Sequence, residues 1–174
     1  MQTSLTFKII LGGEGGVGKT TLLHKYIENR FLEDTKLTIG VEILNKEIIL
    51  PDETICALQL WDFGGQERFR FMQDSFVRGA SGALLMFDMA VLFTFNKLND
   101  WVKLFRKFDP NLPIVLLGSK FDLKNRTVQD EYVEKFISEN NIKTYLRTSS
   151  KTGLNVKEAF NSLLWEVMEY KGII

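Results

Sequence analysis

The segment from Gly13 to Thr20 has the residue types and spacing of a phosphate-binding loop. Its glycines let backbone N–H groups surround a β-phosphate, while Lys19 can reach β- and γ-phosphate oxygens and the Thr20 hydroxyl can ligate Mg²⁺. A helix-period segment begins at Lys19, and the positive end of its dipole also favours anions. A glycine-rich turn with a surface lysine is the alternative. The predicted phosphate-binding residues are Gly13, Glu14, Gly15, Gly16, Val17, Gly18, Lys19, Thr20 and Thr21.

A second magnesium ligand is expected at Asp62, an acid that ends a strand-like segment. Mg²⁺ prefers one or two protein oxygens completed by waters and phosphates, so Thr20 and Asp62 are a sufficient pair. An acid at the end of a strand is a weak signal alone. The phosphate-binding loop is what makes Asp62 a metal-site candidate.

The segment from Gly118 to Asp122 follows an apolar run and can recognise a base. The Asp122 carboxylate can accept hydrogen bonds from the N1–H and N2 amine of guanine, a donor pair that adenine lacks. Such buried pairing can reject the wrong ligand by roughly 10⁴-fold. Lys120 can lay its methylene stem along the ring. A polar loop carrying Lys and Asp for solubility is the alternative, and these residues alone do not decide between the two.

These segments require a framework in which strands alternate with helices. Central segments such as 82–88 and 114–118 are almost wholly apolar, as in parallel strands buried on both faces. The alternation predicts one domain over residues 1–174: a doubly wound α/β fold with a mainly parallel six-stranded sheet, one antiparallel edge strand from a hairpin, and helices on both faces. Strands are expected at 5–11, 41–50, 55–62, 82–88, 114–118 and 144–148, and helices at 19–30, around Trp101 to Phe108, around Tyr132 to Ile137, and at 156–168.

Composition favours a small ligand over a polymer. The 174 residues contain 22 Lys+Arg and 22 Asp+Glu, so the net charge gives no reason to expect nucleic acid or an anionic membrane as the main partner. The only cysteine, Cys56, lies in an apolar run and is expected to be a buried thiol in a reducing compartment. No run approaches a membrane span and no cysteine lies near the C-terminus, so we expect a cytoplasmic protein without a direct membrane anchor.

The order and spacing of three motifs resemble those of the Ras-superfamily small GTPases over essentially the whole chain. They are the phosphate-binding loop, the run from Trp61 to Glu67, and the run from Ser119 to Asp122. Within that superfamily the chain is most similar to the Rab branch. The similar segments are Thr38–Glu42, Leu58–Asp62, Gln66–Arg70 and Arg78–Ala80.

The resemblance implies roles for further residues. Thr38 matches a threonine that ligates Mg²⁺ when a γ-phosphate is present. Gly65 matches a glycine whose N–H donates to that phosphate, and Gln66 matches the glutamine that orients the attacking water. Together with Lys19 these form the implied catalytic set. Phe31 matches an aromatic that covers the base, and Ser149, Ser150 and Lys151 match a loop that meets guanine O6.

Three departures from the family pattern bear on function. Ser119 replaces the usual Asn and is expected to lose a contact that ties this loop to the phosphate-binding loop. Phe63 and Gly64 replace the Thr-Ala usual in Rab, whereas Arf-like proteins read Val-Gly before the same Gly-Gln. This mixture is what we expect of an archaeal relative. Finally, no prenylatable cysteine tail is present in this sequence.

The resemblance implies a GTP/GDP switch with slow hydrolysis, bound to Mg²⁺. Effectors, exchange factors and GTPase-activating proteins would bind residues 31–43 and 61–76. Ile43, Trp61 and Phe76 match an apolar triad that meets effectors, although they can equally cover the edge of the sheet. Two rival functions are a nucleotide-binding scaffold that does not hydrolyse GTP, suggested by Ser119 and Phe63, and a P-loop kinase or ATPase.

Overall fold

The computed structural model describes residues 4–33, 37–64 and 67–174. Their strands form one six-stranded sheet in the order β2-β3-β1-β4-β5-β6. Only β2 is antiparallel to its neighbour, which confirms the predicted sheet. The strands are β1 (Ser4–Gly12), β2 (Val41–Ile49), β3 (Ile55–Phe63), β4 (Gly82–Asp88), β5 (Ile114–Ser119) and β6 (Thr144–Arg147).

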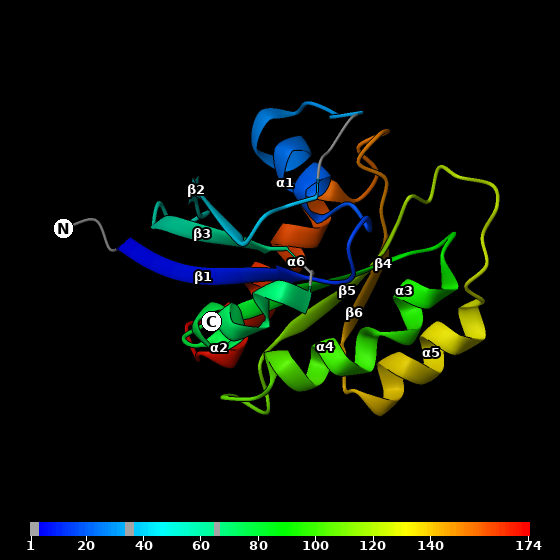
Figure 1. The fold of residues 1–174 in the computed structure, drawn as a ribbon. Helices are drawn as coiled ribbons and strands as arrows, with labels where there is room; N and C mark the ends of the chain where they lie inside the picture. Colours follow the sequence, from blue (N-terminus) through cyan, green and yellow to red (C-terminus); the bar gives the residue numbers. More distant parts are fainter. Residues whose placement is uncertain (1–3, 34–36, 65–66) are drawn as a thin grey trace.

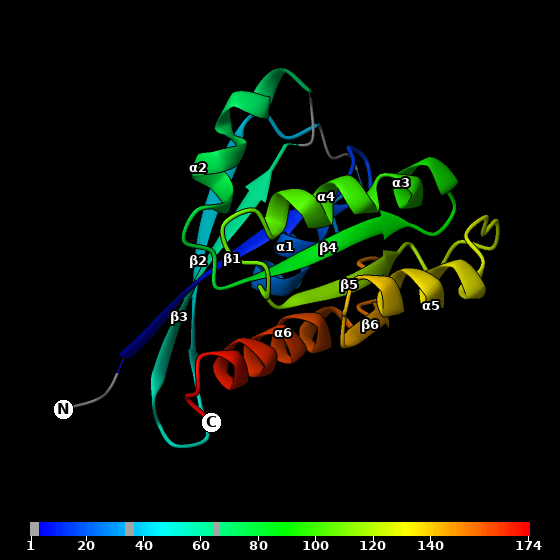
Figure 2. The same ribbon diagram turned by 90° about the horizontal axis from the view of Figure 1, so that it is seen from below.

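Helices cover both faces of the sheet (Figures 1 and 2). They are α1 (Lys19–Glu28), the 3₁₀ helix η1 (Glu67–Met72), α2 (Gln73–Val77), α3 (Leu92–Asn96), α4 (Leu98–Phe105), α5 (Asp130–Glu139) and α6 (Val156–Tyr170). One core joins the sheet to α1 and α6, and the other joins it to α2, α4 and α5. Successive side chains of a strand point to opposite faces, so one strand contributes to both cores. Ile9 and Leu11 of β1 pack into the first core and Ile10 into the second.

Element ends differ from the expected ones by a few residues. Helix α1 ends at Glu28 because Asn29 adopts a left-handed conformation, with φ of 52°, and its N–H donates to the Lys25 carbonyl. Helix α4 ends at Phe105, so Phe108 does not share its buried face and is 40% exposed. Cys56 is buried as expected. None of the described helices is both long and apolar enough to cross a bilayer.

The parallel strands β1, β3, β4 and β5 end at the same edge of the sheet, where open α/β sheets bind ligands. The phosphate-binding loop begins immediately after β1. Gly12 is required there, because a Cβ would lie 2.2 Å from the Phe105 ring and 2.8 Å from Trp101. A Cβ on Gly13 would meet the Met86 carbonyl oxygen at 2.3 Å, and its φ of +139° is also unfavourable for other residues. The loop therefore packs closely against α4 and β4.

Candidate nucleotide-binding site

The phosphate-binding loop folds around the ammonium group of Lys19. This side chain is buried, and its Nζ donates to the carbonyl oxygens of Gly13 at 2.7 Å and Glu14 at 3.1 Å. Burial lowers the pKa of Lys19 to about 8, against the opposing influence of the Asp62 and Glu14 carboxylates. A buried ammonium with neutral partners is poised to exchange these carbonyls for phosphate oxygens.

Oxygen atoms from three separate segments meet beside this loop. The hydroxyl oxygens of Thr20 and Thr38 lie 2.7 Å apart, and both hydroxyls donate to Asp62 Oδ2, Thr38 over 3.4 Å. Asp62 is fully buried, and its Oδ1 has no hydrogen-bond partner among the described residues. Burial raises the pKa of Asp62, and the Thr20 hydrogen bond and Lys19 oppose that rise.

This donor set fits magnesium. Two hydroxyls and one carboxylate are hard oxygen ligands, and Asp62 Oδ1 accepts no hydrogen bond from the described residues. Across the described residues no group of three or more His, Cys, Asp or Glu side chains is placed to hold a metal. The cluster is therefore suited to an ion that keeps waters and phosphates as its other ligands.

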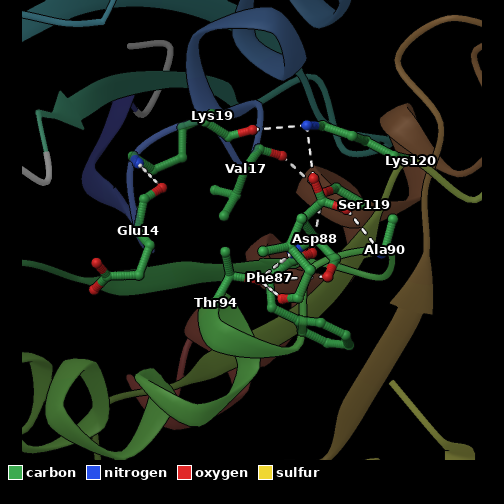
Figure 3. Close-up of polar contacts among 11 residues, drawn as sticks. Glu14, Val17, Lys19, Phe87, Asp88, Ala90, Thr94, Ser119 and Lys120 are labelled. Atoms are coloured by element: carbon green, nitrogen blue, oxygen red, sulfur yellow. Dashed lines mark hydrogen bonds and ion pairs between the residues drawn. The ribbon is translucent and has the colours of Figure 1, made fainter. Parts of the chain in front are cut away.

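Ser119 corrects the expectation that serine breaks the link to the phosphate-binding loop. Its buried hydroxyl lies 2.7 Å from the Val17 carbonyl oxygen and 2.9 Å from that of Phe87 (Figure 3). One O–H proton is shared between two acceptors. The short side chain suffices because Ser119 ends β5 at the sheet edge beside the loop, so the tether persists without an amide.

Two loops after β5 and β6 bring the predicted base-binding residues together. The Ser149 hydroxyl donates to Asp122 Oδ1 at 2.8 Å, which leaves Asp122 Oδ2 without a protein donor among these contacts. The Phe121 N–H donates to the Thr148 carbonyl at 3.0 Å, and the Thr148 N–H to that of Gly118 at 2.8 Å. The carboxylate is thus held by one oxygen while its exposed side faces solvent.

A cavity of about 470 Å³ joins these parts, a size typical of small-ligand pockets. Phe31 and Thr38 form part of its wall. Gly13, Glu14, Asp62 and Ser149 lie beside the wall rather than in it, and Gly65 and Gln66 lie outside the described residues. The other predicted residues that line the cavity are Gly15, Gly16, Val17, Gly18, Lys19, Thr20, Thr21, Ser119, Lys120, Asp122, Ser150 and Lys151.

Two contacts at the site were not predicted. The Asp88 carboxylate, at the end of β4, forms an ion pair with Lys120. The Trp101 Nε1–H donates to the Glu14 carboxylate at 3.0 Å, tying α4 to the phosphate-binding loop. Asp88 carries only a weak sequence signal, as an acid that ends a central strand like Asp62, and its pairing with Lys120 depends on strand order.

The apolar triad is only partly exposed. Ile43 is 47% exposed and lies opposite half-buried Trp61 in the β2–β3 pair, but Phe76 is 1% exposed and packs on Phe63 with ring centroids 4.8 Å apart. Lys8 covers Trp61, its Nζ lying 3.7 Å from the ring centroid. The alternative that these aromatics cover the sheet therefore holds for Phe76 in this conformation.

Comparison with known proteins agrees with this geometry. A family model described as the Ras family matches residues 8–169. The chain is 41% identical to the cattle (Bos taurus) Ras-related protein Rab-7b over 99% of this chain and 88% of the relative. It is 42% identical to the human (Homo sapiens) Ras-related protein Rab-7b over 93% of this chain and 82% of the relative. It is 40% identical to the GTP-binding protein ypt3 of Schizosaccharomyces pombe over 92% of this chain and 75% of the relative. The chain therefore belongs to the Ras family, in its Rab branch, and is a small GTPase that binds a guanine nucleotide and hydrolyses GTP.

Proposed function

We propose that this GTPase holds its nucleotide in the 470 Å³ cavity and uses the oxygen cluster beside it to sense the γ-phosphate. The observation that carries the proposal is the meeting of Thr20, Thr38 and Asp62, which come from α1, the segment before β2, and β3. Each segment belongs to a different part of the chain. A ligand that pulls these oxygens toward itself therefore acts on all three at once.

The phosphate end of the ligand lies against the loop after β1. Backbone N–H groups of residues 13–18 and the buried ammonium of Lys19 neutralise the phosphates. Thr20, Thr38 and Asp62 would hold Mg²⁺, which supplies charge neutralisation for phosphoryl transfer.

The base end lies between the two loops that follow β5 and β6. Asp122 accepts the two guanine hydrogen bonds with Oδ2 and with the lone pair of Oδ1 that Ser149 does not use. Lys120 and Phe31 cover the ring, and Ser150 and Lys151 line the same wall. This arrangement favours guanine over adenine, because adenine would leave the carboxylate without donors.

Hydrolysis would be carried by positioning and charge neutralisation. Gln66 is proposed from its sequence match to orient the attacking water, with Gly65 and Thr38 at the γ-phosphate and Lys19 at the β- and γ-phosphate oxygens. No arginine lines the cavity among the described residues. Slow unaided turnover is therefore expected, with a partner's arginine able to accelerate it by about 10³–10⁵-fold.

Nucleotide state would be transmitted through the contact between the segment before β2, at residues 38–40, and Gly64 after β3. The Gly64 N–H donates to the Gly40 carbonyl at 2.8 Å, and a Cβ on Gly64 would lie 2.2 Å from the Thr38 carbonyl oxygen. Movement of Thr38 toward a γ-phosphate must therefore move both segments. Effectors, exchange factors and activating proteins in the cytoplasm would recognise residues 31–43 and 61–76 in these states.

The test uses Gln66→Leu with Gln59→Leu as control, since Gln59 is exposed on β3 away from the cavity. Single-turnover phosphate release from bound GTP should fall at least tenfold in Gln66→Leu and stay unchanged in Gln59→Leu, while GDP affinity stays nearly constant in both. Equal rates in the two variants would remove Gln66 from the mechanism. Displacement of bound GDP by ATP as readily as by GTP would contradict the guanine site.

A further inference from the structure

Asp88 is a buried carboxylate with no role in the site as proposed above. It ends β4, it is 3% exposed, and each carboxylate oxygen has one partner. Oδ2 lies 2.7 Å from Lys120 Nζ, and Oδ1 accepts the Ala90 N–H at 2.8 Å (Figure 3). A charge buried to this extent is retained where it is paired and hydrogen-bonded.

The partner of Asp88 is a residue held under constraint. Lys120 has a left-handed backbone with φ of 60°, which non-glycine residues adopt rarely. Its Nζ also donates to the Gly16 carbonyl at 2.8 Å, so the ammonium lies between the end of β4 and the phosphate-binding loop. Its stem therefore runs from a constrained backbone to a fixed ammonium, and the residue lines the nucleotide cavity.

The backbone of Asp88 is held by hydrogen bonds to the start of α3 and by its pairing with β5. Its backbone N–H donates to the Thr94 hydroxyl at 2.9 Å, and that hydroxyl donates to the Val91 carbonyl at 2.7 Å. In the β4–β5 ladder Asp88 lies opposite Ser119, the residue before Lys120. Asp88 is thus rigidly placed to set where the Lys120 ammonium lies.

We infer that Asp88 is a positioning residue for purine binding, which acts by holding the stem of Lys120 against the face of the base. The inference rests on the proposed base site. A stem packed on a ring face does not distinguish one purine from another, whereas Asp122 reads the N2 amine. Asp88 therefore sets affinity for any purine nucleotide at this site and leaves base selectivity to Asp122.

The test compares dissociation of GDP with that of inosine diphosphate, which lacks the N2 amine. Asp88→Asn keeps an oxygen for the Ala90 N–H but removes the counter-ion of Lys120. Dissociation of both nucleotides should accelerate by the same factor, about tenfold for one lost charge-assisted contact. Asp122→Asn should instead abolish the preference for GDP over inosine diphosphate. A changed preference in Asp88→Asn would overturn the inference.

A double-mutant cycle separates positioning from general support. Lys120→Met keeps an unbranched apolar stem without the ammonium, so it should match Asp88→Asn, and the double variant should be no worse than either. Thr94→Val removes the hydroxyl that holds the Asp88 backbone, so its effect on dissociation should be smaller in Lys120→Met than in the wild type. Additive effects of Asp88→Asn and Lys120→Met would overturn the inference. If Asp88→Asn fails to fold, Lys120→Met alone must accelerate dissociation of GDP and of inosine diphosphate by the same factor for the inference to stand.

The outcomes also separate this inference from the proposed function. A base site elsewhere would leave GDP dissociation unchanged in both Lys120→Met and Asp122→Asn. If the base site is correct but Asp88 does not position Lys120, then Lys120→Met would accelerate GDP dissociation and Asp88→Asn would not. Thermal unfolding of each variant establishes that the fold is intact.

Discussion

Ser119 shows how a single hydroxyl can replace a larger side chain when the backbone brings it close enough. The Val17 carbonyl belongs to the phosphate-binding loop, so the hydrogen bond joins the base loop to the phosphate loop. Ser119→Ala should accelerate GDP dissociation by roughly fivefold, the effect of about 1 kcal/mol for one net hydrogen bond. Ser119→Asn should not slow dissociation, because the tether already exists. Stopped-flow release of a fluorescent GDP measures both, and a slower release from Ser119→Asn would show that the serine tether is incomplete.

Asp122 should determine which base is bound. Asp122→Asn replaces a carboxylate with an amide that cannot accept both guanine donors, so GDP binding should weaken by about 2–4 kcal/mol. Xanthine nucleotides should bind better than to the wild type, because their extra carbonyl accepts from the amide. Competition with a fluorescent nucleotide measures both effects. Unchanged GDP affinity in this variant would place the base elsewhere.

At the scale of single residues, the sequence predicted those residues whose role depends on a local motif. Lys19, Thr20 and Asp122 are identified by the spacing of their own segments, and the structure brings them to one cavity. Asp88 and the Ser119 tether were not predicted, because each depends on which strand lies beside which. Strand order comes from long-range pairing and cannot be obtained from the spacing of neighbouring residues.

At the scale of elements, buried central strands were the most predictable feature. Segments β4 and β5 are apolar at nearly every position, so two-sided burial and a parallel arrangement followed directly. Helix ends were less predictable. Phe108 continues the apolar period of α4, but the helix stops at Phe105, and Phe108 instead lies beside Arg78, whose guanidinium carbon is 4.2 Å from its ring centroid. The apolar period alone therefore does not locate this helix end.

Helix α6 contains an acid whose ionisation opposes folding. Burial raises the pKa of Glu166, against the Thr144 hydrogen bond that opposes the rise. The folded state then binds a proton that the unfolded state releases, so stability falls as pH rises from the usual glutamate pKa through the raised value. Glu166→Gln keeps an oxygen for the Thr144 hydroxyl and removes this dependence.

Thermal unfolding from pH 4 to 7 tests this expectation. Glu166→Gln should gain stability relative to wild type as pH rises, with the two converging at the acid end. The exposed Glu134→Gln on α5 serves as the control. A Glu166→Gln advantage that does not change with pH would mean that packing, and not ionisation, is responsible.

At the scale of the whole molecule, the ligand should act as a structural part. A ligand that binds only the folded state raises the free energy of unfolding by RT ln(1 + [L]/Kd). This is about 4 kcal/mol when the free ligand concentration is a thousand times Kd. Removal of Mg²⁺ by chelation, followed by removal of nucleotide, should lower the melting temperature in two steps. Amide exchange should increase most in residues 12–20, 37–41 and 119–122. A melting temperature that is indifferent to both removals would contradict a ligand at this site.

The cavity is assembled from segments that are very far apart along the chain. The hydrogen bonds from Ser119 to Val17 and from Lys120 to Gly16 span 102 and 104 residues, and Ser149 must also reach Asp122. During synthesis the phosphate-binding loop emerges early, yet we expect the complete site to retain a nucleotide only after Ser149 has left the ribosome. Nearly the whole chain must therefore be made before GTP or GDP can assist its folding, and a nascent chain paused before β6 would depend on chaperones.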